Sequence, residues 1–149
     1  MSFLKTYIHF VWSTKNRRPF MASLETRKMM WTHIEENALK KNIFVDRVGG
    51  YAEHCHCLVS LGVDQTMQQI MQLIKGESSF WFNRQSLINE KFFWQDQFYA
   101  VSVSPERISI VRNYIDKQEV HHNSAVSCRE LDKYLKKYEF QEYIDMDLG

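Results

Sequence analysis

Apolar residues recur along this chain with two different periods, and the changes of period predict the order of its elements. Stretches rich in aromatic and β-branched residues predict strands, at 7–12, 43–48, 51–61 and 92–103. Helical spacing of apolar residues predicts helices, at 23–41, 66–83 and 104–121, with a last helix that begins at Ser127. Residues typical of element ends mark the boundaries: Ser23 and Ser104 as N-caps, Pro105 at a first helical position, Gly49-Gly50 as a hairpin turn and Ser127-Cys128-Arg129-Glu130 as a capping box.

The predicted order of elements is β-α-β-β-α-β, followed by two C-terminal helices. The first six elements match the ferredoxin-like arrangement, an α+β fold built on an antiparallel sheet. Such a sheet can carry its helices on one face and leave the other face open for a ligand. The 149 residues, 44% of them apolar, suit a single domain over 1–149 with a substantial core. The fold alone implies no particular function.

The sequence favours a cytoplasmic protein without a membrane partner. No run of about 18 apolar residues is present to span a membrane. The N-terminus lacks the charged start, apolar stretch and small-residue cleavage site of a signal peptide. The three cysteines, Cys55, Cys57 and Cys128, are an odd set, which suggests reduced thiols.

Charge is unevenly distributed although its sum is small. The net charge is +1, but the first 50 residues are basic and the remainder is acidic. Basic clusters could contact nucleic-acid phosphates, and they consist of Lys15, Arg17 and Arg18 in one loop and Lys40, Lys41 and Arg47 further on. On charge alone, an ordinary solvated surface is the more common explanation.

Two histidines share one face of the third predicted strand. Side chains alternate between the two faces of a strand, so His54 and His56 lie on one face while Cys55 and Cys57 lie on the other, apolar face. The strand rise separates the histidines by about 6–7 Å along the backbone, and both imidazoles could converge on one metal ion. Taken alone, two half-exposed polar residues are the more frequent explanation. A Cys/His zinc site is disfavoured because the cysteines point away from the histidines.

A tyrosine and a glutamine lie one turn apart on the helix predicted over 104–121. At 3.6 residues per turn, Tyr114 and Gln118 share a face. This face borders an apolar stripe formed by Ile108, Val111 and Ile115. The helix could therefore dock with its polar pair at the edge of a site. Without a partner motif, a surface tyrosine beside a surface glutamine would be the default explanation.

Together the two motifs resemble a known family, the single-tyrosine HUH transposases of small bacterial insertion sequences and the related repeat-associated tyrosine transposases. These insertion sequences move as single-stranded DNA. The resemblance lies in the His-x-His strand at 54–56 and the helical Tyr-x-x-x-Gln about 60 residues later, on predicted elements in the same order. It extends to Phe93-Trp94-Gln95 and to Gln118-Glu119 followed by His121-His122. Cys55 replaces the usual aliphatic residue between the histidines, and a buried cysteine behaves as a small hydrophobe.

The resemblance implies a role for each of four residues. His54 and His56 would ligate a divalent metal with Gln118 as the third ligand, and Tyr114 would be the nucleophile. The metal expected is Mg²⁺ or Mn²⁺, although imidazoles also accept Zn²⁺, Co²⁺ or Ni²⁺. Attack on a phosphodiester would give a 5′-phosphotyrosine and a free 3′-hydroxyl. Because the covalent link conserves the bond, a second strand end could be rejoined without ATP.

The resemblance also implies partners. Family members work as homodimers and recognise DNA hairpins near the ends of the element. In several of them the tyrosine helix serves the metal site of the other subunit. We expect the same shared arrangement here, with 102–104 as a hinge before the tyrosine helix.

Two other functions fit parts of the pattern. A non-catalytic single-stranded nucleic-acid module would use exposed aromatic residues on an open sheet face, and it would have no use for Tyr114 or Gln118. A domesticated relative would cut and join hairpins of short chromosomal repeats by the same chemistry. The flanking genomic DNA would distinguish it from the transposase of a mobile element.

Overall fold

The computed structural model describes residues 2–119, together with 133 and 137. Its strands and helices are β1 (Tyr7–Ser13), α1 (Leu24–Lys40), β2 (Phe44–Tyr51), β3 (His54–Ser60), α2 (Met67–Arg84), β4 (Tyr99–Val103) and α3 (Ile108–Asp116), with short 3-10 turns η1 (Lys15–Arg17) and η2 (Pro105–Arg107). The helix predicted to begin at Ser127 lies outside the described residues. No described helix is both long and apolar enough to cross a membrane.

The strands form one antiparallel sheet in the order β2-β3-β1-β4. β1 and β3 are the central pair, and the helical connections α1 and α2 lie between β1 and β2 and between β3 and β4. This connectivity is that of the ferredoxin-like fold. The α+β, ferredoxin-like prediction is therefore confirmed, and the two histidines of β3 lie in the middle of the sheet.

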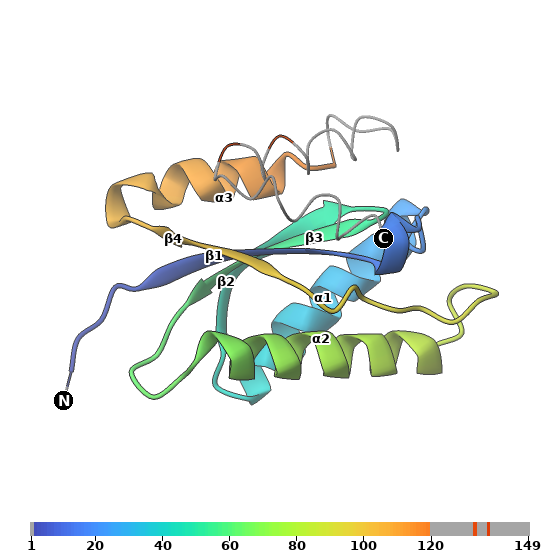
Figure 1. Cartoon of the computed structure of the whole chain (residues 1–149), viewed down its shortest axis with the longest axis horizontal. Helices are drawn as coiled ribbons and strands as arrows, with labels where there is room; N and C mark the ends of the chain where they lie inside the picture. The colour runs from blue at the N-terminus through green and yellow to red at the C-terminus, as the bar shows by residue number, and fades with distance from the viewer. Residues whose placement is uncertain (1, 120–132, 134–136, 138–149) are drawn as a thin grey trace.

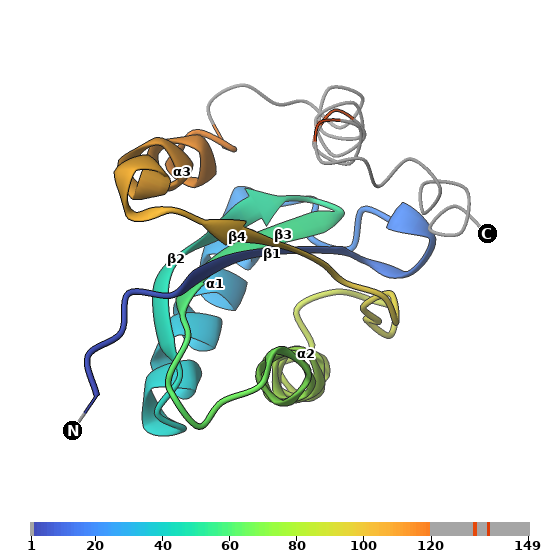
Figure 2. The ribbon, with the colours of Figure 1, turned by 60° about the vertical axis from the view of Figure 1, so that its left-hand side comes forward.

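The two faces of the sheet are covered by different helices. α1 and α2 lie side by side against one face, and α3 crosses the opposite face (Figures 1 and 2). The expectation that this opposite face would be open is wrong. The apolar stripe of α3 packs on it because both surfaces would otherwise expose apolar area to water, in a cluster of Leu58, Ile108, Val111 and Ile115.

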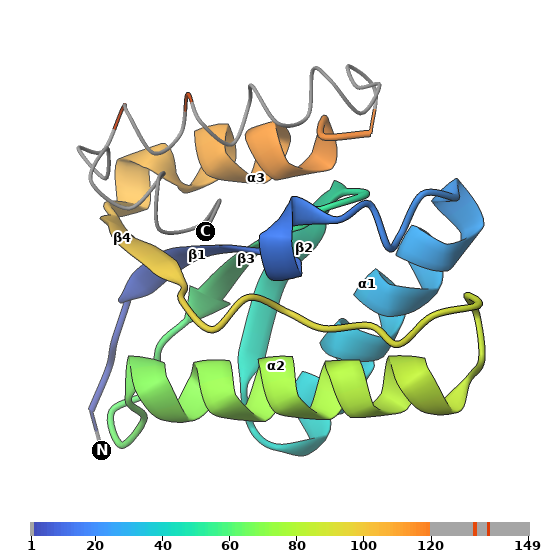
Figure 3. The same cartoon turned by 45° about the vertical axis from the view of Figure 1, so that its right-hand side comes forward.

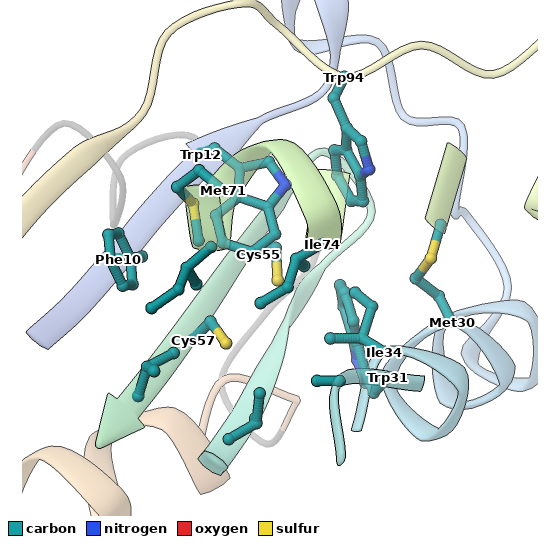
Figure 4. Packing of buried hydrophobic residues seen from close by; sticks show 14 of the residues in the cluster. Phe10, Trp12, Met30, Trp31, Ile34, Cys55, Cys57, Met71, Ile74 and Trp94 are labelled. Atoms are coloured by element: carbon teal, nitrogen blue, oxygen red, sulfur yellow. The ribbon is translucent and has the colours of Figure 1, made fainter. Parts of the chain in front are cut away.

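The main core lies between the sheet and the layer formed by α1 and α2. Phe10 and Trp12 of β1 point into it beside Cys55 and Cys57 of β3 (Figure 4). They meet apolar side chains of both helices, among them Met30, Ile34, Met71 and Ile74. The cysteine face of β3 is apolar, as predicted, and it packs under these helices. The histidines that alternate with the cysteines therefore face α3.

The turn between β2 and β3 comes later than predicted. Gly49 and Gly50 belong to β2, and the turn consists of Ala52 and Glu53. A Cβ atom on Gly50 would lie 2.1 Å from the carbonyl oxygen of His54. Glycine is therefore required for the close approach of two backbones, which is a known role of glycine inside strands.

β4 is shorter than the strand predicted over 92–103. The residues before Tyr99 instead form an irregular segment that runs alongside α2 (Figure 3). Lys75 of α2 donates hydrogen bonds to the carbonyl oxygens of residues 95, 96 and 97, with N···O distances of 2.6, 3.0 and 3.2 Å. A lysine side chain thus satisfies backbone groups that a strand partner would otherwise satisfy, which aromatic composition could not reveal.

Most helices begin at the residues that the sequence predicted. The Ser23 hydroxyl accepts a hydrogen bond from the Thr26 amide at 3.0 Å, which confirms its role as the N-cap of α1. Ser104 precedes Pro105 as predicted, but its side chain makes no capping bond and the segment starts with the 3-10 turn η2. α3 then ends at Asp116, so Gln118 lies just beyond the helix.

Candidate active site

His54 and His56 lie together on the buried face of β3 that looks toward α3. In the antiparallel register, His54 stands opposite Ser13 and His56 opposite Val11. Both histidines are 0% exposed, and their ring centroids are 5.0 Å apart with an interplanar angle of 82°. The histidines are therefore not two half-exposed polar residues, and their burial requires polar partners.

The cysteines lie on the opposite side of the sheet from the histidines. Cys55 and Cys57 are free thiols in the main core. Burial raises the pKa of both thiols, so they stay protonated and are poor metal ligands. A Cys/His zinc site at this strand is excluded by this geometry. Cys128 lies outside the described residues.

Close packing and ion pairs fix α3 above the histidines. A Cβ atom on Gly49 would lie 3.1 Å from the carbonyl oxygen of Ile115, so the absence of a side chain allows α3 to approach β2 closely. Arg112 donates two hydrogen bonds of 2.7 Å to the Asp46 carboxylate, and Arg47 lies 3.4 Å from Asp116. Bidentate pairs of this kind restrict orientation as well as position.

A further ion pair anchors the residues that follow α3. Arg27 of α1, which is buried, donates to both carboxylate oxygens of Glu119 at 2.8 and 2.9 Å. The same guanidinium donates to the backbone carbonyl oxygens of Met21 and Ala22. Glu119 follows Gln118 directly, so this pair holds the chain in place beside the histidines.

Tyr114 places its ring over the histidine face. The ring is half-buried, its centroid lies 5.3 Å from that of His56, and the two rings are perpendicular. Tyr114 therefore lies against the histidines of its own chain. The expected sharing of the tyrosine helix between subunits stays a prediction. The short η2 turn connects β4 to α3. The apolar stripe of α3 then packs on the same sheet that contains β4.

Gln118 approaches the other histidine. It is 2% exposed, and its Oε1 atom lies 3.2 Å from Nε2 of His54. Its side-chain amide nitrogen donates to the Tyr114 carbonyl oxygen at 3.3 Å, which directs Oε1 toward the histidine. The structure thus brings His54, His56, Tyr114 and Gln118 together in one place.

Glu53 belongs to the site although neither sequence motif includes it. Its carboxylate lies 2.8 Å from Nδ1 of His54, and both side chains are buried. A metal-binding histidine commonly donates its second ring nitrogen to a carboxylate, which fixes the tautomer and orients the ring. The signal available in the sequence was an acidic residue next to a histidine pair, which is weak by itself.

His9 is the second site residue that the sequence motifs do not include. Its Nε2 atom lies 3.0 Å from Nδ1 of His56, and it is 3% exposed. Burial, together with the positive charge of Lys137, lowers the pKa of His9 to about 3, so its imidazole is neutral at physiological pH. Alternation along the strand predicted over 7–12 assigns His9 to one of its two faces. Nothing in that strand indicates which of the two faces carries the site.

The residues present fit a divalent metal. Nδ1 of His54 lies 2.8 Å from the Glu53 carboxylate, and its Nε2 atom faces the Gln118 oxygen at 3.2 Å. In the tautomer that donates from Nδ1 to Glu53, the lone pair on Nε2 is directed at the Gln118 oxygen. In that tautomer a cation between Nε2 and Oε1 would bind both atoms. Ligands in adjacent positions about a metal with bonds of about 2.1 Å are about 3.0–3.4 Å apart, which matches. Within the described residues no three His, Cys, Asp or Glu side chains form a metal-binding group. With His54 and His56, the further donor in reach of His54 is the Gln118 amide oxygen.

The basic loop around η1 is partly used inside the protein. Arg17 is buried, and Arg18 pairs with Glu90 at 2.6 Å. Lys15 is exposed, with its ammonium group 5.5 Å from the centroid of the Phe93 ring, and Lys91 lies 5.2 Å from the same ring. The burial of Arg17 leaves it little surface for a phosphate, while Lys15 is exposed and stays available to a ligand.

The ferredoxin-like sheet and the convergence of two histidines, a glutamine and a tyrosine agree in placement with the arrangement that the sequence resemblance predicted. The model of the family described as "Transposase IS200 like" matches residues 2–118, and the chain therefore belongs to this family. No curated protein matches the chain significantly.

Two solved structures share the fold. One is a protein from Deinococcus radiodurans assigned as a transposase, with 14% identity, a TM-score of 0.63, and coverage of 79% of this chain and 95% of that one. The other is a REP-associated tyrosine transposase bound to a REP hairpin, with 20% identity, a TM-score of 0.59, and coverage of 83% of this chain and 76% of that one. At these identities the likeness supports the fold alone.

Proposed function

We propose that this transposase cleaves and rejoins single-stranded DNA with Tyr114 as nucleophile and with a divalent metal held by His54, His56 and Gln118. The observation that supports the proposal most strongly is the convergence of these four side chains from β3 and α3. Gln118 Oε1 lies 3.2 Å from His54 Nε2, and the Tyr114 ring lies 5.3 Å from the His56 ring. A purely structural role would not require this combination of buried polar groups.

The reaction forms a bond between the Tyr114 oxygen and phosphorus and breaks the bond between phosphorus and the 3′-oxygen. The phenol gives up its proton, and the departing 3′-oxygen takes up a proton from solvent, so atoms and charge balance. A free phenol has a pKa near 10 and needs activation to react at neutral pH. A bound Mg²⁺ or Mn²⁺ would polarise the scissile phosphate and favour the phenolate.

The substrate proposed is single-stranded DNA next to a hairpin. A structural relative was solved with a REP hairpin, and by analogy we propose hairpin recognition for this chain. The exposed ring of Phe93, with Lys15 and Lys91 over it, offers a stacking surface and two cations for the flanking strand. We also propose a homodimer in which each subunit carries a complete site of its own.

The related repeat-associated activity is an alternative within the same chemistry. If the flanking genomic DNA contains dispersed palindromic repeats and no element ends, the natural substrates are repeat hairpins. The non-catalytic module is disfavoured, because α3 covers the sheet face on which bases would stack and presents Tyr114 there.

The test uses oligonucleotides that span the genomic flanks of the reading frame, labelled at either end and incubated with Mn²⁺. Attack by Tyr114 retains the 5′-phosphate on the protein, so a 3′-label is expected to migrate with the protein and a 5′-label is not. Tyr114→Phe should abolish the adduct but keep DNA binding. Tyr7→Phe is the matched control, since Tyr7 packs in the same apolar cluster. Adducts at the wild-type rate in Tyr114→Phe would identify another nucleophile.

A further inference from the structure

We infer that His9 is a positioning residue for His56: its Nε2 atom accepts the Nδ1 hydrogen of His56 and so directs the Nε2 lone pair of His56 to the metal. The inference rests on the proposed function, since it assigns a part to a residue behind a proposed ligand. It concerns a residue of β1, which neither the histidine motif nor the tyrosine helix contains.

The geometry brings the two rings together across the central strand pair. His9 stands opposite Leu58 in the register, which makes it the diagonal neighbour of His56 on the same face. Diagonal neighbours lie about 7–8 Å apart at the backbone, within reach of long side chains. The two nitrogens are 3.0 Å apart, both residues are buried, and the ring centroids are separated by 5.1 Å.

The direction of this hydrogen bond determines which nitrogen of His56 can bind a metal. Between two imidazole nitrogens, one must donate and the other must accept. If His56 donates from Nδ1, its Nε2 atom carries the lone pair that a metal requires. If His9 donated instead, neutral His56 would carry its hydrogen on Nε2 and could not ligate through that atom. In the first arrangement His9 is the acceptor at Nε2 and carries its own hydrogen on Nδ1.

The two ligands would therefore have supports of different charge. His54 is supported by the Glu53 carboxylate and His56 by a neutral imidazole. The His9 ring also lies 6.3 Å from the Tyr114 ring, where the DNA phosphate would arrive. A second buried carboxylate at this position would repel both that phosphate and a forming phenolate. A neutral acceptor orients His56 without this repulsion.

The experiment compares His9→Leu, which removes the acceptor, with His9→Gln, which can place an amide oxygen near the former Nε2 position. Mn²⁺ affinity is measured by electron paramagnetic resonance of free Mn²⁺, without DNA. We expect His9→Leu to weaken Mn²⁺ binding by about 10- to 100-fold and His9→Gln to recover most of the loss. Val101→Ala is the matched control, because Val101 stands beside His9 on β4 and has no polar side-chain atom.

Two results would overturn the inference while leaving the proposed function intact. One is an Mn²⁺ affinity of His9→Leu equal to that of the wild type, in an experiment in which His56→Ala loses Mn²⁺ binding. The other is equal loss in His9→Leu and His9→Gln, which would indicate packing rather than acceptance. If wild-type protein binds no divalent metal, the proposed metal site and the inference both fail.

A measurement on the unaltered protein does not depend on the folding of any variant. Imidazole ¹⁵N chemical shifts distinguish protonated from unprotonated ring nitrogens. The inference predicts a protonated Nδ1 in His56 and an unprotonated Nε2 in His9. The opposite assignment in folded wild-type protein would refute it.

Discussion

At the scale of single residues, both proposed histidine ligands use Nδ1 for a buried neighbour. Nδ1 of His54 faces Glu53 at 2.8 Å, and Nδ1 of His56 faces His9 at 3.0 Å. In both rings Nε2 is therefore the nitrogen that can serve as a metal ligand. Groups that orient ligands in this way commonly change metal affinity by about 10- to 100-fold when they are lost, so these neighbours matter as much as the motif itself.

Glu53→Gln tests the charge of the support for His54. The amide keeps an oxygen that can accept the Nδ1 hydrogen but removes the negative charge that strengthens the histidine as a ligand. We expect Mn²⁺ affinity to fall by about 10-fold, and further in Glu53→Ala. Glu90→Gln is the control, because Glu90 pairs with Arg18 on the surface. Unchanged Mn²⁺ binding in Glu53→Gln would show that the carboxylate has no part in the site.

At the scale of elements, the position of α3 decides whether the site exists. Tyr114 and Gln118 reach the histidines because the helix packs closely on β2 and β3 and is tied to them by Arg112 and Asp46. Arg27 and Glu119 then hold the chain beyond its end. A shift of the helix by a fraction of a helical turn would separate the tyrosine from the metal ligands.

Gly49→Ala is expected to displace α3. The new Cβ atom would lie 3.1 Å from the Ile115 carbonyl oxygen and 3.2 Å from its Cγ2 atom, so the helix must move. Since misplacement of reacting groups by about 1 Å can cost about 100-fold, we expect covalent adduct formation to fall by about 10-fold or more. The comparison is Gly76→Ala in α2, where a Cβ atom meets nothing within 4 Å.

Gly76→Ala should keep full activity and raise the free energy of unfolding by about 0.5–1 kcal/mol, as measured by urea denaturation. Equal activity of the Gly49→Ala protein and the wild type would mean that the close approach of α3 is not needed for cleavage.

The segment between α2 and β4 provides the second test at this scale. Phe93 is 43% exposed with two lysines over its ring, while Phe80 is 62% exposed with Arg84 over its ring. Removing a stacking ring costs about 1–3 kcal/mol per base, so Phe93→Ala should weaken binding of single-stranded DNA by about 5- to 160-fold. Fluorescence anisotropy would measure this, with Phe80→Ala as the control that keeps affinity. Equal effects of both changes would contradict a specific strand contact at Phe93.

At the scale of the whole molecule, all proposed site residues come from one chain. The sheet supplies the histidines and their supports, and α3 returns to the same sheet with the tyrosine. Within one chain, the four proposed site residues already lie together. A homodimer built from such chains would carry two independent active sites.

A mixture of two inactive variants distinguishes the two arrangements. In a heterodimer of Tyr114→Phe and His56→Ala subunits, every site formed within one chain carries one lesion. We therefore expect no adduct above the level of either homodimer. The heterodimer would be purified through two different tags, and its binding of hairpin DNA would show that it is folded. Clear recovery of adduct formation would establish sharing between subunits instead.

Local patterns in the amino-acid sequence determined much of this protein by themselves. Alternation placed His54 and His56 on one face with the cysteines on the other, and helical spacing paired Tyr114 with Gln118. These inferences hold because side-chain direction along one strand or one helix follows from local backbone geometry. The order of elements also predicted the ferredoxin-like sheet, because few topologies join such an order with short connections.

Contacts between distant segments were decided by the tertiary structure. His9 reaches His56 through the register of β1 against β3, and Gly50 is needed because two backbones meet there. The sheet face that was expected to be open is covered because the stripe on α3 finds Leu58 of its own chain, which also places Tyr114 against its own histidines. None of these contacts is determined only by the residues that are near each position in the sequence. They follow from how complete surfaces pack to remove apolar area from water and to satisfy buried polar groups.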